Sequence, residues 1–354
     1  MYGKLKKIHK YVKGETVMTA RNIDGLIEKV YKSVLDHKLD EGKYCRWRWQ
    51  NKDGTRNLGS NEYGCADAAN ILYTIGRFET DYAKRQAAVK EMQSFQNPET
   101  GLFSEPTHHA IHTTAHVTAA LQLFDAKPLY PFYAFEKYKT KEGLYELLES
   151  LEWIKSPWNN SHQGAGIYAA FACTGEATLE WQNWYFDWLW KETDPETGMW
   201  RKGCIYTPES TPSFTSMAGS FHYMFNHEHA RRPYRYPDKL VDCLINMYDN
   251  EIYRDRPNFG ALCGFIEVDW VFALNRATRQ TPHRFYEAKD RIIVFAKKYI
   301  DYLEAVDENT DETFNDLHML FGSVCCLAEF QAALPGEFES TYPLHVVLDR
   351  RPFI

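Results

Sequence analysis

The segment Gly-Ala-Gly-Ile-Tyr-Ala-Ala-Phe-Ala-Cys, residues 164–173, decides the fold of this chain. It contains no charged residue, and a helix without a polar face is buried on all sides. Its glycines and alanines let neighbouring backbones approach closely. Comparable small-residue segments recur along the whole chain and lie 47 to 59 residues apart; they occupy residues 65–76, 116–124, 164–173, 217–225, 264–274 and 323–334.

A longer amphipathic segment with bulky residues precedes each small-residue segment. In residues 238–249, for example, Leu240, Val241, Leu244 and Ile245 fall on one helical face. A repeat of about fifty residues over the full length is typical of a repeat architecture. We therefore predict an all-α fold, an (α/α)6 toroid of six helical hairpins with an inner ring of small-residue helices. The amphipathic helices of the predicted outer ring are residues 25–37, 82–96, 133–154, 178–192, 238–249 and 284–304.

The repeat also predicts the domain organisation. No linker rich in Gly, Ser or Pro interrupts it, so one large domain is expected. We predict an N-terminal extension at residues 1–23, the toroid at residues 24–335 and a C-terminal tail, packed on the toroid, at residues 336–354.

Composition and charge exclude several classes of protein. The formal net charge is −7 and the basic residues are scattered, which argues against a nucleic-acid partner. No apolar run is long enough to cross a membrane. Residues 1–14 are polar and do not resemble a signal peptide. The eight cysteines form no C-x-x-C pair and fit a reducing compartment, so we expect a cytoplasmic protein.

Two loops repeat at the level of single residues. The segment Asn-Pro-Glu-Thr-Gly-Leu-Phe at 97–103 matches Asp-Pro-Glu-Thr-Gly-Met-Trp at 194–200, and both follow an outer helix. The proline ends the helix, the glycine permits a tight turn and the aromatic residue packs inside. We interpret both loops as structural. The connections from outer to inner helices are long, and binding residues are expected on their rim.

This six-hairpin pattern, with its Gly-x-Phe and Gly-x-Trp turns, resembles the six-hairpin glycosidase-like and terpenoid-cyclase-like toroids. The resemblance covers residues of about 24–335 and is one of architecture. It implies a central cleft at the rim that carries the long loops. It does not imply a reaction, because one fold supports many functions.

Histidines gather at the predicted rim, before and within the second inner helix. His108 and His109 precede His112 and His116, which are four residues apart and can share a helix face. That spacing suits a metal, but no H-E-x-x-H motif and no nearby third ligand accompany it. We therefore expect His112 and His116 to bind substrate or, alternatively, to be hydrogen-bonded structural histidines, and we expect no metal and no cofactor.

The segment Ser-Pro-Trp-Asn-Asn-Ser-His-Gln at 156–163 is the most suggestive stretch for function. Carboxamides and tryptophan suit a sugar, and asparagine with histidine can neutralise a uronate and remove its C5 proton. The segment loosely resembles toroidal polysaccharide lyases in this respect. Alternatively, Asn160 or Ser161 simply caps a helix. The candidates are Trp158, Asn159, Asn160 and Gln163 for substrate binding and His162 for catalysis.

Glu267 and Asp269 lie in an otherwise apolar inner helix, and buried carboxylates are costly unless they are paired or functional. Their side chains point about 200° apart, so they cannot form a catalytic pair with each other. Asp67, on the first inner helix, is the expected partner of one of them. Alternatively, each acid is paired with an arginine such as Arg256. Further candidates for substrate binding are Trp200, Arg201, His222, Asp316 and His318.

These residues favour a carbohydrate-active enzyme that binds a small molecule or an oligosaccharide. The leading prediction is a glycoside hydrolase that uses Asp67 with Glu267 or Asp269. A polysaccharide lyase or sugar epimerase with His162 or His116 as base is the alternative. A terpenoid cyclase lacks support, because D-x-D-D and D-D-x-x-D motifs are absent. A non-catalytic sugar-binding protein stays open, as does the oligomeric state.

Overall fold

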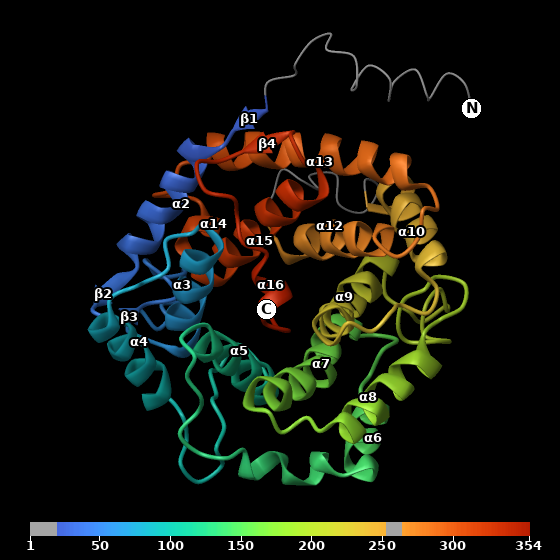
Figure 1. Cartoon of the computed structure of the whole chain (residues 1–354), viewed down its shortest axis with the longest axis horizontal. Helices are drawn as coiled ribbons and strands as arrows, with labels where there is room; N and C mark the ends of the chain where they lie inside the picture. The colour runs from blue at the N-terminus through green and yellow to red at the C-terminus, as the bar shows by residue number, and fades with distance from the viewer. Residues whose placement is uncertain (1–19, 253–263) are drawn as a thin grey trace.

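The computed structural model describes residues 20–252 and 264–354. Helices dominate the described chain and its strands are only two or three residues long, which confirms the all-α prediction. Among the described residues, no helix is both long and apolar enough to cross a lipid bilayer. Figure 1 shows the helices arranged around a centre, with one set inside another.

The inner set in the described chain consists of six helices that pack in a closed cycle. Each helix contacts the next one along the chain, and the last contacts the first. They contain the small-residue segments and are almost fully buried. Their bounds are α3 (Glu62–Thr74), α5 (Ala110–Leu123), α7 (Pro157–Thr174), α9 (Ser213–Ala230), α12 (Phe265–Thr278) and α15 (Leu317–Ala333).

The outer helices cover this cycle, and two of them differ from the predicted segments. The segment predicted at 133–154 is broken at Thr140, whose hydroxyl accepts a hydrogen bond from the backbone N–H of Gly143 and caps a new helix. The segment predicted at 238–249 ends in a π-helical turn. The outer elements are α2 (Asp24–Asp36), α4 (Tyr82–Ser94), η1 (Tyr133–Lys139), α6 (Lys141–Ser150), α8 (Leu179–Glu192), α10 (Pro237–Asn246), η2 (Met247–Ile252) and α13 (Phe285–Ala305).

Five of the six inner helices begin several residues before the predicted small-residue segments. Asn61 caps α3, His109 caps α5 and Asp316 caps α15, each through a side-chain acceptor for a backbone N–H. Pro157 occupies the first turn of α7, where its missing N–H has no cost. The polar segments before the apolar cores are therefore helical, and their side chains are held in register with the ring.

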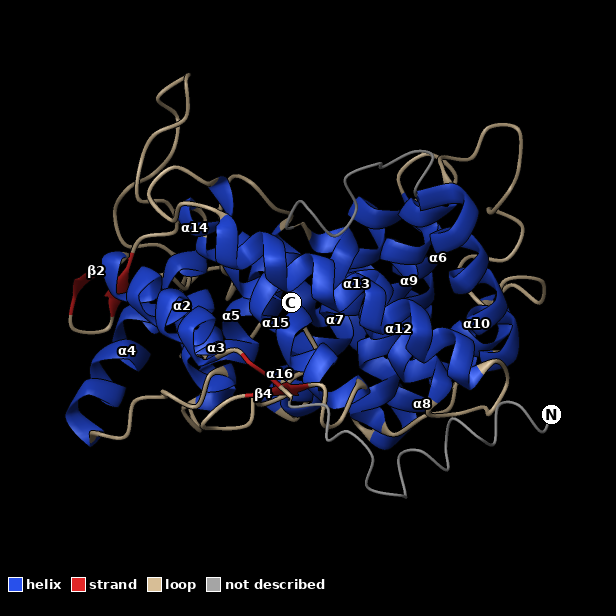
Figure 2. Cartoon of the chain, turned by 90° about the horizontal axis from the view of Figure 1, so that it is seen from above, coloured by secondary structure: helices blue, strands red, loops and turns tan. Residues whose placement is uncertain are grey.

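Short elements lie at the two ends of the inner cycle. Figure 2 shows α14 (Glu312–Asn315) on one side of the helices and β4 (Phe338–Glu339) with α16 (Val347–Arg350) on the other. β4 pairs with β1 (Arg21–Asn22) in parallel, whereas β2 (Lys38–Asp40) pairs with β3 (Lys43–Tyr44) in antiparallel. After α16, Arg351 and Phe353 are fully buried. Figure 1 shows the C-terminus at the centre of the cycle.

The two matching loops have the same structure. In each, the glycine has a positive φ, 75° at Gly101 and 73° in its counterpart. The aromatic residues Phe103 and Trp200 are buried. The backbone N–H of Phe103 donates to the hydroxyl of Thr114 at 3.0 Å, and that of Trp200 donates to Ser220 at 2.9 Å. Both loops therefore fasten an aromatic residue to a hydroxyl on the following inner helix.

Candidate functional site

A cavity of about 330 Å³ lies at the N-terminal ends of the inner helices. Imidazoles from α5, α7, α9 and α15 meet there, with an arginine and a threonine from two loops. Phe221, Phe265 and Ile354 supply apolar wall. The polar and aromatic lining consists of His108, His109, His112, His162, His222 and His318 with Arg46, Thr107, Trp158, Asn159 and Asp269.

Asp67 lies directly behind this cavity and holds two imidazoles. Its Oδ1 accepts a hydrogen bond from His116 Nε2 at 2.7 Å, and its Oδ2 lies 3.1 Å from His318 Nδ1. The carboxylate is fully buried. Burial opposes its charge, but attraction and hydrogen bonds from His318 and His116 prevail and hold the pKa of Asp67 below its usual range. Asp67 is therefore an ionised acceptor that orients His318.

His116 is a neutral link between Asp67 and the buried C-terminal segment. Burial lowers the pKa of His116 to about 4, against the opposing attraction of Asp67. Its Nδ1 lies 3.4 Å from the guanidinium nitrogen Nη2 of Arg351, which can only donate. The His116 Nε2 therefore carries the proton and donates it to Asp67. This leaves both ring nitrogens of His116 engaged, and the residue does not line the cavity.

The ring of Tyr63 organises the imidazoles from below. It is stacked on His108 and His116 at centroid distances of 4.6 and 5.0 Å and meets His318 edge-on at 4.8 Å. Its hydroxyl lies 2.5 Å from Nδ1 of His112. Burial lowers the pKa of His112 well below its ordinary value, so this ring is neutral as well.

Hydrogen bonds around Thr107 fix the tautomer of His108. The Thr107 hydroxyl donates to Glu105 and accepts from Nη1 of Arg46 at 2.8 Å. Its one proton is thus used, so the contact of 2.7 Å to His108 Nδ1 is a bond donated by the imidazole. Nε2 of His108 therefore carries a lone pair.

The same reasoning fixes the tautomer of His222 on the opposite wall. The hydroxyl of Ser161 donates to the backbone carbonyl of Trp158 at 2.8 Å. It therefore accepts from His222 Nδ1, which lies 2.7 Å away. Burial lowers the pKa of His222 to about 3, so the ring is neutral at neutral pH. Its Nε2 is a bare nitrogen in the wall of the cavity.

Arg46 and Asp316 form an ion pair beside the imidazoles. Arg46 donates from Nε and Nη2 to the two carboxylate oxygens of Asp316 at 2.9 and 3.0 Å. The indole N–H of Trp47 and the backbone N–H of His318 donate to the same carboxylate. Asp316 thus positions His318 and Arg46, while Arg46 itself lines the cavity.

The predicted acids do not all reach the cavity. Glu267 and Asp269 are both buried, but only Asp269 is part of the lining. Asp67, the expected partner, lies behind His318. The alternative partner Arg256 falls outside the described residues.

The other predicted residues fall into two groups. Trp158, Asn159 and His162 line the cavity with His112, His222 and His318, as described above. Asn160 does not line it, because its amide donates to the carbonyl of Ser156 within the first turn of α7; Gln163 is half-buried outside the lining. Ser161 bonds to His222 and forms no cap.

Trp200 and Arg201, which were predicted to bind substrate, are also remote from the cavity. The indole of Trp200 is buried and donates to the carbonyl of Leu189 at 2.7 Å. Arg201 donates to Glu192 at 2.8 Å and pairs with Glu149. These contacts account for both side chains without a ligand.

Sequence reasoning did not single out Arg46, Thr107 or Tyr63. Arg46 belongs to the alternating run Arg-Trp-Arg-Trp at 46–49, in a long loop on the rim, and that run was a usable signal. Tyr63 lies two residues before the first predicted small-residue segment, 65–76. Its role became visible only when the helix of that segment was found to begin at Glu62.

Neutral imidazoles with bare nitrogens can accept protons or bind a metal ion, and both uses fit a wall of this composition. Comparisons with models of protein families, with curated proteins and with solved structures found no match to this chain.

Proposed function

We propose that this chain is an enzyme with an (α/α)6 toroid of the six-hairpin type, and that it acts on a carbohydrate by transferring a proton from carbon to an imidazole. The reaction class is that of a polysaccharide lyase or a sugar epimerase. One observation carries this proposal: in the described lining of the cavity six imidazoles meet a single carboxylate side chain, that of Asp269.

A glycoside hydrolase fits this lining less well. Such an enzyme needs two carboxyl groups on either side of the scissile bond, about 5–10 Å apart. Asp67 is ionised and occupied by two imidazoles, so it can neither donate a proton nor reach a sugar. Glu267 is buried outside the lining. The paired-carboxylate prediction therefore gives way to the imidazole alternative.

His222 is the best candidate for the base. Its Nδ1 donates a hydrogen bond to the hydroxyl of Ser161, so Nε2 has a free lone pair that can take a proton from the substrate. His162 stands next to it, with ring centroids 4.2 Å apart, in the same wall. We assign catalysis to His222 rather than to His116, since both nitrogens of His116 are already bonded.

An acidic sugar is the substrate class that suits the remaining lining. Trp158 offers an aromatic face to a sugar ring, and Asn159 offers a carboxamide. Arg46 is a cation in the same wall and suits a carboxylate. The cavity is at the small end of ligand pockets, which fits one or two sugar units bound at a time.

The proposed step removes the proton on the carbon next to the sugar carboxylate. His222 Nε2 takes this proton, and the electron pair of the C–H bond stays on the carbon as a carbanion that is delocalised into the neighbouring carboxylate. In a lyase this electron pair forms a double bond to the neighbouring ring carbon while the bond from that ring carbon to the leaving oxygen breaks, and the oxygen takes a proton from water. In an epimerase the carbanion instead takes a proton from water on its other face.

The architecture supports the same proposal. The inner helices pack in a closed cycle and the cavity lies at their N-terminal ends, where a six-hairpin toroid has its cleft. The seven described cysteines are free thiols, which supports a reducing compartment such as the cytoplasm.

The test is a panel of uronate-containing oligosaccharides and polysaccharides incubated with the full chain. A lyase product has a conjugated double bond that absorbs in the ultraviolet, and an epimerase product is seen by NMR. His222→Gln should lower turnover by about 10²–10⁴-fold. His229→Gln is the matched control, because His229 lies on the same helix and bonds to Tyr168 away from the cavity.

Three results would contradict the proposal. Saturated products with a new reducing end would restore the hydrolase prediction. Binding of a sugar without turnover would indicate a sugar-binding protein. Equal turnover by wild type and the His222→Gln variant would remove His222 from the mechanism.

A further inference from the structure

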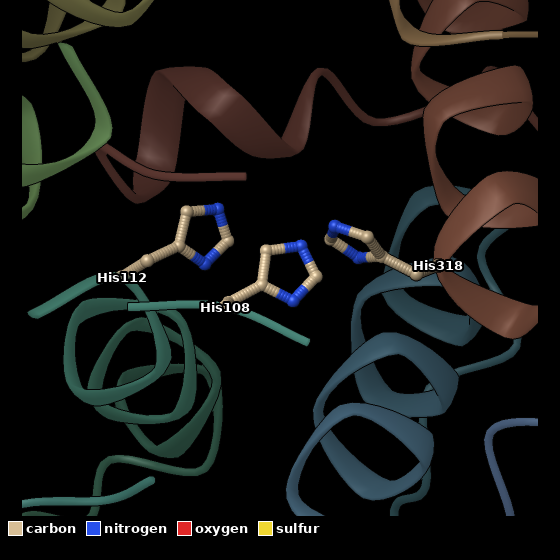
Figure 3. Close-up of side chains that lie close together, drawn as sticks. All are labelled: His108, His112 and His318. Atoms are coloured by element: carbon tan, nitrogen blue, oxygen red, sulfur yellow. The ribbon is translucent and has the colours of Figure 1, made fainter. Parts of the chain in front are cut away.

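We propose that His108, His112 and His318 form a binding site for a divalent transition-metal ion, with Zn²⁺ as the best match. The three rings come from the loop before α5, from α5 itself and from the first turn of α15. Figure 3 shows them projecting into one space. One ligand nitrogen of each ring lies within 4.8 Å of the other two.

The hydrogen bonds behind these rings are those of metal-binding imidazoles. A metal-ligating histidine almost always uses its second nitrogen to hold a carboxylate or another oxygen, which orients the ring. Here Nδ1 of His318 is held by the carboxylate of Asp67. Nδ1 of His108 is held by Thr107, and Nδ1 of His112 by the hydroxyl of Tyr63. Because Nδ1 is engaged in all three rings, Nε2 is the nitrogen of each ring that we assign to the metal.

The geometry requires only a small adjustment. With Zn–N bonds of about 2.0–2.1 Å, the nitrogens of a tetrahedral site are about 3.3–3.4 Å apart. Rotations of the three rings can bring their nitrogens from within 4.8 Å to this separation. Three imidazoles leave the fourth position open toward the cavity, as in catalytic zinc sites.

A second group of side chains, Asp67, His116 and His318, also meets the distance criterion. It is fully buried, and its members already hydrogen-bond to one another. A metal there would have to replace these bonds and would have no open position. The group that lines the cavity is therefore the one that we assign to the metal.

The metal would lie in the wall of the cavity opposite His222 and would contribute to the proposed reaction. At its open fourth position a divalent ion would bind the carboxylate of a substrate and would stabilise the negative charge that forms when the neighbouring proton leaves. This role rests on the proposed function, whereas the binding of the metal does not.

The test uses the full chain after removal of metals with a chelator. Titration with Co²⁺ alone should give the visible absorption of a four-coordinate ion and saturate at one equivalent, and Zn²⁺ should displace it. Absence of stoichiometric Co²⁺ and Zn²⁺ binding to the wild-type chain would overturn the proposal, whatever the variants do.

Variants then locate the ion. His108→Ala and His318→Ala should each weaken binding at least about 100-fold, and Asp67→Asn about 10–100-fold. His162→Ala is the matched control, since His162 lines the same cavity outside the proposed site. Retention of wild-type affinity in His108→Ala would overturn the assignment. Circular dichroism of the metal-free variants checks their folding.

His116→Asn separates the two groups. It should leave Co²⁺ affinity within about threefold, because His116 is not a ligand of the proposed site; loss of binding in this variant alone would move the ion to the buried group. Metal binding without action on uronates would leave the site standing and refute the proposed function. Action on uronates without metal binding would do the reverse.

Discussion

The polar side chains at the two ends of the inner helices are bonded in opposite ways. At the C-terminal ends, the buried guanidinium of Arg276 donates to Glu329 at 2.5 Å and to Glu228 at 3.3 Å, and it also pairs with Asp349. These charges satisfy one another. At the N-terminal ends, imidazoles such as His222 are fixed through one nitrogen and present the other to a cavity.

The difference separates residues that stabilise the ring from residues that are available for chemistry. Both ends are built from the same helices, α12 and α15 among them, and both bury charged groups. In the described residues six imidazoles line the cavity at the N-terminal end, whereas the cavity at the C-terminal end has a single imidazole, His227, in its lining. Substitutions at the C-terminal end should therefore affect stability, and substitutions at the N-terminal end should affect function more than stability.

The largest effect on stability is expected from Arg276→Met. Removing this guanidinium leaves Glu329 buried without its cation, which should lower the free energy of unfolding by about 3–5 kcal/mol. Urea denaturation measures the change. Arg279→Met is the control, because Arg279 is exposed at the end of the same helix and should change stability by less than about 0.5 kcal/mol. Equal losses in both variants would contradict the contrast.

Arg46→Met tests the ion pair at the N-terminal end. The carboxylate of Asp316 keeps the Trp47 indole and the backbone N–H of His318, so the cost should be only about 1–3 kcal/mol. Binding of an acidic sugar should weaken in parallel. A loss of stability as large as in Arg276→Met, with unchanged sugar binding measured by calorimetry, would argue that both ends are purely structural.

Acid should destabilise both ends. Burial lowers the pKa of His227, toward the C-terminal end of α9, to about 4. Between that value and about 6.5 the unfolded chain binds a proton that the folded chain does not, so stability falls with falling pH. The slope is about 1.4 kcal/mol per pH unit for each such histidine. In His227→Phe, urea titrations at several pH values should show a slope smaller by that amount; an unchanged slope would show that His227 is charged when folded.

The smallest effect is expected from Arg201→Gln. Arg201 pairs with Glu192 and Glu149 at the partly exposed surface, and such pairs contribute at most about 1 kcal/mol. Because the residue is remote from the cavity, KM should not change. An increase in KM comparable to that of Arg46→Met would restore Arg201 as a substrate-binding residue.

The sequence predicted which helices are buried on all sides and which are amphipathic, because this property depends on the local pattern of residues. The segment 164–173 has no polar face, and the helix that contains it is buried. The starts of the helices were less predictable, since caps such as Asn61 and Asp316 act by single hydrogen bonds. The break at Thr140 has the same cause, because a cap can divide an amphipathic segment without disturbing its periodicity.

The site was predictable as a region but not as an arrangement. His112 and His162 were candidates because they fall near the starts of predicted inner helices, and His222 was a candidate because it lies within one. That Asp67 holds His318 could not be foreseen, because the two residues are 251 positions apart in sequence. The sequence shows no third metal ligand close to His112, and this argued against a metal. The third imidazole, that of His318, comes from a distant part of the chain. Spatial neighbours from distant hairpins carry no signal in one sequence.

Exchange of carbon-bound hydrogen with solvent tests the central claim most directly. The full chain acts on a uronate substrate in deuterated water, and mass spectrometry with NMR follows the hydrogen on the carbon next to the carboxylate. Proton transfer to an imidazole predicts that this hydrogen is lost from a lyase product or replaced by deuterium in an epimerised one, and that His222→Gln abolishes the exchange. Products that keep the original hydrogen while incorporating oxygen from water would contradict the account.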